Sequence, residues 1–215
     1  MLRVLLTGFA PFGGETVNPS ERAILALAAA PPAGIALATA VLPVAYAGAP
    51  PALHAAIAAH DPQVVLATGL AGGRALIGVE RVAINIDDAR IADNDGVRRI
   101  DAPVVPGGPA AYFATLPIKA IAAAIRAAGV PAEVSQSAGT FLCNHVFYRC
   151  CHIAATARPG LRAGFLHLPW LPEQATAHPG EPSMALDAVL CGLQAALATL
   201  RDAAADLQVA DGAIC

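Results

Sequence analysis

The sequence predicts an α/β fold, with an open, mostly parallel, twisted sheet that carries helices on both faces. Short apolar runs rich in Val, Ile and Leu alternate along the chain with longer Ala-rich segments of helical periodicity. Such alternation is typical of parallel sheets, because each parallel strand needs a crossover segment to return the chain. The 215 residues suit one large domain, so we expect a single domain over 1–215, with a frayed tail at 206–215.

Six segments are predicted to be strands. Residues 2–9 (LRVLLTGF) form a nearly continuous apolar run, as expected for a strand that is buried on both faces. Residues 79–86 (VERVAINI) alternate in polarity and favour β-branched types, which is typical of a strand. The remaining predicted strands are 35–43, 63–68, 132–137 and 162–168.

Five segments are predicted to be helices. Asn18 or Ser20 is a candidate N-cap of the first, which ends at the pair Pro31-Pro32. Pro117 lies inside the predicted helix 112–128 and suits the first turn of a helix that restarts there. Apart from the first, the predicted helices are 51–60, 112–128, 143–157 and 183–205.

Residues 87–109 form a long excursion without a periodic pattern. They are polar at first and then rich in Gly and Pro. Loops of this length in a compact domain are usually functional or form an interface. We therefore expect this segment to be an arm between subunits of a symmetric homo-oligomer.

Composition excludes several classes of function. Hydrophobic residues reach 56%, but much of this is alanine, and no uninterrupted apolar run reaches the ~18–20 residues that span a bilayer. The first residues, MLRVLLTGFAPFGG, are broken by Gly and Pro too early for a secretory signal. The net charge is −3 and no basic block exists, so we expect neither a membrane nor a nucleic-acid partner. An odd count of five cysteines favours free thiols in a reducing, cytoplasmic compartment.

Cys143 is the first residue whose position suggests chemistry. It follows a predicted strand and a short turn, and it opens a predicted helix. The unpaired N–H groups and the dipole at a helix N-terminus favour a thiolate and can stabilise an oxyanion. The alternative is a buried core cysteine.

His167 and Glu80 are candidate partners of that thiol. His167 is close to the end of the strand 162–168, at the edge of the sheet where Cys143 is expected, although core histidines are common in such positions. His145 is a competing base, but residues two apart on a helix point about 200° apart. Glu80 could orient an imidazole, or it could be a surface residue paired with Arg81.

Two further patterns carry weaker signals. The loop GLAGGR (69–74) is Gly-rich like a phosphate-binding loop, but it matches neither spacing that such loops use. Cys150, Cys151 and His152 are adjacent, so their side chains diverge around a helix and make a poor metal-ligand set.

These segments together resemble the pyrrolidone-carboxylate peptidases (pyroglutamyl peptidase type I), a family of cysteine exopeptidases. The matching stretches run in the family's order from near the N-terminus to about residue 175. They are TGFAPFGGETVNPS, GLAGGR, ERVAINIDDARIADNDG, GPAAYFATLPIKA, SQSAGTFLCNHVFY and GFLHLPWLPEQA.

The resemblance implies a role for each matched residue. Cys143 would be the nucleophile, His167 the general base and Glu80 the third catalytic residue. The pocket for the pyroglutamyl ring of an N-terminally pyroglutamylated peptide would be lined by Phe9, Phe12, Phe141 and Leu142. The resemblance also implies a three-layer α/β/α domain, a cytosolic location, a homotetramer, and neither metal nor cofactor.

Three positions depart from the family pattern. Many bacterial members have Gln where this chain has Leu70, Ser or Thr where it has Gly78, and Pro where it has Ala92. The departures leave the fine detail of the pocket open. Two other functions remain open as well: a divergent member that only binds a small ligand, and a nucleoside- or phosphate-binding enzyme suggested by GLAGGR.

Overall fold

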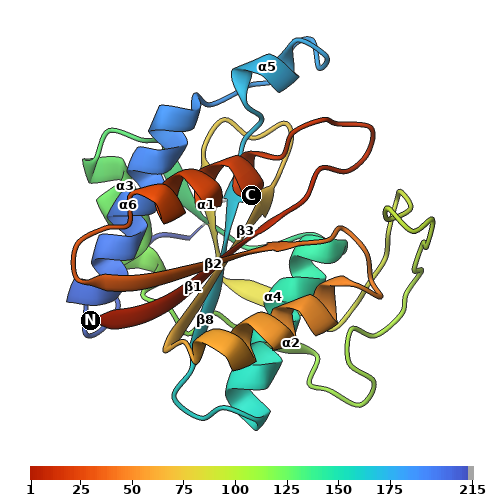
Figure 1. Cartoon of the computed structure of the whole chain (residues 1–215), viewed down its shortest axis with the longest axis horizontal. Coiled ribbons are helices and arrows are strands. Elements are labelled where there is room, and N and C mark those ends of the chain that lie inside the picture. Colours follow the sequence, from red (N-terminus) through yellow and green to blue (C-terminus); the bar gives the residue numbers. More distant parts are fainter. Residues whose placement is uncertain (213–215) are drawn as a thin grey trace.

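The computed structural model describes residues 1–212 and places a twisted six-stranded sheet between two layers of helices (Figure 1). The strands lie in the order β2-β1-β3-β8-β4-β7. Their bounds are β1 Leu2–Phe9, β2 Ile35–Leu42, β3 Val64–Leu70, β4 Ile77–Glu80, β7 Ala132–Ser135 and β8 Arg162–Leu168. The predicted α/β fold with a mostly parallel sheet is therefore confirmed.

The helices divide between the two faces of the sheet according to their apolar sides. The helices α1 (Pro19–Ala29), α3 (Ile118–Ala127) and α6 (Leu186–Asp202) pack on one face. The helices α2 (Ala49–His60) and α4 (Leu142–Thr156) pack on the other, together with the rings of Phe147 and Phe165. The short helix α5 (Pro172–Ala175) follows β8 beyond the end of the sheet (Figure 1).

One strand pairing in the main sheet is antiparallel, and it joins the fourth and fifth strands in the order of the sheet. β4 runs antiparallel to β8, with Gly78 opposite His167, and β7 then pairs parallel to β4. The sheet therefore consists of four strands that run one way and two that run the other. This reversal brings the end of β4 to the middle of β8.

The predicted strand 79–86 is divided between two sheets. At Arg81 the N–H donates to the carbonyl of Ser135 in β7, while the carbonyl accepts from Ala114, after β6. The chain thus leaves the main sheet at this residue, and β5 (Val82–Ile84) pairs with β6 (Ala111–Phe113) in a separate two-stranded sheet. Alternating polarity predicted the extended conformation correctly but carried no information about the partner strand.

The start of the predicted helix 112–128 is wrong. Tyr112 and Phe113 belong to β6, and α3 begins only after Pro117, which offers no side-chain cap. Asp206 supplies that cap from the far end of the chain, since its carboxylate accepts from the N–H groups of Lys119 and Ala120. Pairing with β5 therefore overrides the helical propensity of the first residues.

The residues that follow α6 are held against the fold, where the sequence alone predicted a frayed tail. Besides the cap that Asp206 makes, Asp211 forms an ion pair with Arg126 at 2.9 Å, and Val209 accepts from Lys119 Nζ. The last three residues of that predicted tail lie outside the described residues.

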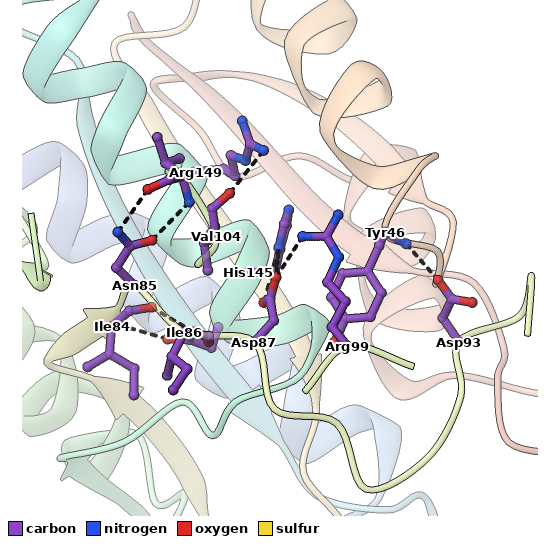
Figure 2. A network of polar contacts seen from close by, with 12 residues as sticks. Tyr46, Ile84, Asn85, Ile86, Asp87, Asp93, Arg99, Val104, His145 and Arg149 are labelled. Carbon is purple, nitrogen blue, oxygen red and sulfur yellow. Dashed lines mark hydrogen bonds and ion pairs between the residues drawn. The ribbon is translucent and has the colours of Figure 1, made fainter. Parts of the chain in front are cut away.

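The excursion 87–109 is anchored to the body of the fold by buried polar groups. The Asp87 carboxylate accepts from Arg99 and from Nδ1 of His145 on α4, each at 2.9 Å (Figure 2). The Asp93 carboxylate accepts from the N–H of Tyr46, and Arg149 donates to the carbonyl of Val104. The segment therefore has a fixed course although it contains neither helix nor strand. Within residues 1–212, no helix is long and apolar enough to cross a membrane.

Candidate active site

Cys143 lies in the first turn of α4, directly over β3. Phe141 is the extended N-cap residue of α4, so the N–H groups of the first turn, Cys143 included, have no partner within the helix. A Cβ atom added at Gly69 would lie 2.7 Å from the Sγ atom of Cys143, so the sulfur sits against that glycine. A short turn joins α4 to β8, and the two elements run in opposite directions. The N-terminus of α4 therefore lies near the carboxyl end of β8.

His167 lies beside Gly69 in the sheet. The two residues are register partners in the parallel pair β3–β8. Register partners point to the same face of a sheet, and Phe165, two residues before His167, contacts the same side of Gly69 as Cys143 does. The imidazole and the thiol therefore share one face at the carboxyl edge of these strands.

Glu80 is fully buried and orients the imidazole. Its Oε1 atom lies 2.7 Å from Nδ1 of His167. The side chain reaches back over Gly78, where a Cβ atom would lie only 3.3 Å from Oε1. With Nδ1 engaged, Nε2 is the nitrogen that remains for the thiol and the substrate. Arg81, the surface partner considered for Glu80, instead donates to Gln136.

Arg74 is a site residue that sequence reasoning missed. Its guanidinium donates to Oε1 of Glu80 at 3.0 Å and to the Oγ of Ser135 at 3.3 Å. Among the described residues, the Oε2 atom of Glu80 has no hydrogen-bond partner, so Oε1 alone connects this buried charge to its cation. A Cβ at Gly78 would lie 2.6 Å from the guanidinium. The departure from Ser or Thr at Gly78 thus leaves room for the Arg74–Glu80 ion pair.

The acidity of the Cys143 thiol differs from the expectation. Burial raises its pKa to about 12; the Glu80 charge adds to this effect, and Arg74 opposes it. The helix N-terminus was expected to favour a thiolate, but desolvation disfavours the anion more strongly. The raised pKa favours a neutral thiol in the resting site, so a base has to take the proton when Cys143 ionises.

An apolar cavity adjoins the thiol. It is lined by Phe9, Phe12, Asn18, Val44, Leu70, Phe141, Leu142 and Cys143. The four residues that the sequence suggested for a ring pocket are therefore in one cavity with the candidate nucleophile. Leu70 supplies hydrocarbon to the wall, so no side-chain hydrogen bond reaches the cavity from this position.

A buried charged cluster supports the rear of this cavity. The Phe141 ring meets the edge of Tyr46 at a centroid distance of 5.8 Å, and Tyr46 in turn contacts His145 at 5.4 Å. Arg99 lies over the Tyr46 ring at 4.6 Å and shares Asp87 with His145 (Figure 2). His145 is therefore engaged with Asp87 and packs behind the pocket wall through Tyr46, whereas its position two residues after Cys143 predicted only that it would not face the thiol.

Two of the three glycines of GLAGGR are explained by packing, and the third, Gly73, has a positive φ of 79°. Gly69 makes room for Cys143, and a Cβ at Gly72 would lie 2.6 Å from the indole of Trp170. Among residues 1–212, no group of three or more His, Cys, Asp and Glu side chains is arranged to hold a metal ion.

Comparison with known proteins agrees with this geometry. The sequence model of the family described as Pyroglutamyl peptidase matches residues 2–203. This chain belongs to the pyroglutamyl peptidase family. The pyrrolidone-carboxylate peptidases of Streptomyces coelicolor and Klebsiella pneumoniae are 55% and 52% identical to it, and each alignment covers 99% of both chains.

Solved structures of the family have the same fold. The crystal structure of pyroglutamyl peptidase I from Bacillus amyloliquefaciens superposes with a TM-score of 0.93 at 42% identity, covering 96% of this chain and 100% of that one. A mutant pyrrolidone carboxyl peptidase from Pyrococcus furiosus gives a TM-score of 0.89 at 40% identity, with 93% and 98% covered. The predicted membership of the family is thus confirmed.

The raised pKa of Cys143 predicts how alkylation depends on pH. An ordinary thiol is half ionised near pH 8.5, whereas this one is still largely protonated there. The rate constant for iodoacetamide at Cys143 should therefore keep rising from pH 7 to 10. Mass spectrometry of the modified peptide measures it, with Cys143→Ala giving the background from other thiols. A plateau between pH 7 and 9 would contradict the neutral resting thiol.

Proposed function

We propose that this protein is a cysteine-type pyroglutamyl-peptidase I, an omega peptidase that hydrolyses the bond after an N-terminal pyroglutamyl (5-oxoprolyl) residue of a peptide. The observation that carries the proposal is the buried Glu80–His167 pair beside the Cys143 thiol, at the edge of an apolar cavity. The names of the relatives point to the same reaction.

The acylation step follows from the positions of the three residues. Nε2 of His167 takes the thiol proton while Sγ of Cys143 attacks the pyroglutamyl carbonyl carbon. The N–H groups in the first turn of α4 stabilise the oxyanion that forms. The C–N bond then breaks, the imidazolium gives its proton to the leaving amine, and a thioester remains on Cys143. Glu80 keeps Nδ1 protonated and stabilises the transient imidazolium.

Hydrolysis of the thioester completes the cycle. His167 now takes a proton from a water molecule, whose oxygen attacks the thioester carbonyl. The C–S bond breaks, the sulfur regains its proton, and pyroglutamic acid leaves. Arg74 holds the Glu80 carboxylate in place throughout without reaching the substrate.

The cavity suits the pyroglutamyl ring because the lactam carries no charge. Phe9, Phe12, Phe141 and Leu142 surround it with hydrocarbon, which solvates a neutral ring and leaves a charged N-terminus unsolvated. The cavity measures about 20 Å³, room for about one water molecule. Phe12 and Phe141, which are partly exposed, must therefore move aside to admit the ring.

The competing functions receive less support. A divergent member that only binds a small ligand would not need the Arg74–Glu80–His167 chain, whose buried carboxylate costs free energy to desolvate. A phosphate-binding enzyme would need the glycines of GLAGGR to cradle an anion. The space beside Gly69 is instead filled by Cys143, and the space beside Gly72 is filled by Trp170.

A cytoplasmic homotetramer is the proposed form of the enzyme. Cys143, Cys150, Cys151 and Cys191 are free thiols, as is usual in a reducing compartment. Four of the large exposed apolar side chains lie on the excursion and on strand β6, which follows it in the chain. They are Ile91, Val97, Ile100 and Phe113. Burial against a second copy would remove these side chains from water.

Substitutions in the catalytic chain should fall into a graded series. Cys143→Ala should abolish turnover of a pyroglutamyl amide with a chromogenic leaving group, and His167→Ala should lower kcat nearly as much. Glu80→Gln and Arg74→Gln should cost less, on the order of 10²-fold, and act on kcat more than on KM, because neither residue lines the cavity. Circular dichroism checks the folding of each variant. Full activity in folded Cys143→Ala would end this mechanism.

The cavity predicts selectivity against proline. A prolyl N-terminus has the size of the lactam but bears a charge and lacks the ring carbonyl, so kcat/KM should favour pyroglutamyl over prolyl amides by roughly 10⁴-fold. Phe12→Ala should lower kcat/KM for the pyroglutamyl substrate while Cys143 still reacts with iodoacetamide. Similar kcat/KM values for the two amides would exclude this cavity as the specificity site.

The assembly is tested by mass in solution. Light scattering at micromolar protein should give a multiple of the 21.6 kDa monomer, four times for the tetramer. Replacing the exposed Phe113 with Lys should shift the distribution towards monomers, because it adds a charge to the apolar surface. A native particle of about 22 kDa would refute the oligomer.

A further inference from the structure

A second hollow opens directly from the cavity beside Cys143, and the catalytic chain does not use it. It measures about 330 Å³ and shares Phe12 and Leu70 with the ring cavity. Gly72 and Trp170 line it, each two residues beyond the end of its strand, β3 or β8. We call this hollow the outer groove.

The outer groove lies past His167, near the carboxyl ends of β3 and β8. His167 protonates that amine, so the residue after pyroglutamate has to lie next to His167. Trp170 follows His167 by three residues, and the ladder of β3 and β8 continues past His167 to Leu70 and Leu168. A neighbouring hollow shares Arg90 and Ile91 with the outer groove, but it is lined by Gly139 and Thr140 as well and adjoins the N-terminus of α4, where the oxyanion is expected.

One wall of the outer groove is a rigid aromatic surface. The Trp170 and His178 rings stack with centroids 4.2 Å apart and planes 11° apart. The missing side chain at Gly72 lets the indole lie against the loop. Figure 1 shows that α5 and the loop between β1 and α1 lie at the same end of the molecule, and Gln174 of α5 joins them by donating to Glu15 and to the Val17 carbonyl.

The same wall carries two carboxylates. Trp170 Nε1 donates to Glu181, and His178 Nε2 lies 2.9 Å from Glu15 Oε1. The hydrogen bonds of Gln174 and His178 lower the pKa of Glu15, so it is ionised at neutral pH. Arg90 is the cation that lines the outer groove, and it is exposed next to Ile91. The aromatic wall therefore presents a flat ring edged by negative charge.

We propose that the outer groove binds the residue that follows pyroglutamate, and that its wall favours a planar cationic side chain such as Arg over an acidic one. This inference rests on the proposed peptidase function and adds a specificity site to it. A guanidinium can lie against the stacked Trp170–His178 rings while it pairs with Glu181, and both interactions attract it. An acidic side chain meets the carboxylates of Glu181 and Glu15 instead.

Three peptide amides that differ in one residue test the groove. They are pyroglutamyl-Arg, pyroglutamyl-Ala and pyroglutamyl-Glu amides, with pyroglutamamide as a reference that has no side chain there. Released pyroglutamic acid gives kcat/KM for each. We expect the Arg peptide to exceed the Glu peptide at least about fivefold, a ratio in the range of one partly exposed ion pair plus one cation–π contact.

Two variants and one matched control locate the effect. Glu181→Gln should lower the Arg-to-Glu ratio about threefold, and Trp170→Ala should lower kcat/KM for the Arg peptide more than for pyroglutamamide. Glu173→Gln on α5 removes the same charge from an exposed residue outside the groove, so the native ratio should persist.

The outcomes separate this inference from the proposed function. Failure of the native protein to cleave pyroglutamamide and all three peptides would overturn both. Cleavage of pyroglutamamide with an Arg-to-Glu ratio below about fivefold would overturn the groove alone. An adequate ratio that survives Glu181→Gln, or that falls equally in Glu173→Gln, would overturn it as well, because the effect would then come from elsewhere or from overall charge.

Discussion

The hydrogen bond between Glu80 and His167 depends on the single antiparallel pairing in the sheet. Because β4 runs against β8, Gly78 stands opposite His167, and Glu80 can reach back across it to Nδ1 at 2.7 Å. With β4 parallel to β8, Glu80 would follow the direction of β8 and lie beyond His167. The carboxylate, imidazole and thiol thus come together through strand order rather than through a local motif.

Two glycines create the space that these side chains occupy. Gly69 lies under the Cys143 sulfur, and Gly78 lies under both the Glu80 carboxylate and the Arg74 guanidinium. A methyl group at either position would displace a reacting or orienting atom, and a displacement of about 1 Å can cost on the order of 10²-fold in rate. The Gly-rich loop that resembles a phosphate cradle is thus better understood as the floor of a thiol site.

The sequence predicted those features that local pattern determines. Apolar runs located the main strands, and Asn18 caps α1 as its residue type suggested, since its Oδ1 accepts from the Ser20 N–H. The sequence could not show that the chain passes from one sheet to the other at Arg81, because polar and apolar residues alternate in the same way whichever strand is the partner. It also could not predict β6, because Tyr112 and Phe113 become a strand only through pairing with β5.

The role of Arg74 and the pKa of Cys143 could not be predicted from the sequence, because both depend on charges and packing that only the fold brings together. The resemblance indicated Cys143, His167 and Glu80, but Arg74 lies six residues from Glu80 in a loop, and only the fold brings its charge to the carboxylate. The acidity of Cys143 was misjudged for a related reason. A helix N-terminus can be recognised from sequence, whereas the desolvation that raises the pKa of the thiol depends on the packing around it.

A protonated resting thiol affects which of the cysteines in α4 can react. Burial also raises the pKa of Cys150 and of Cys151, so all three thiols of this helix are weak acids at neutral pH. The thiolate is the form that oxidants and electrophiles attack, so a raised pKa slows the reaction of all three thiols at neutral pH. Cys143 differs in lying over Gly69, the register partner of His167, so its proton has an acceptor nearby.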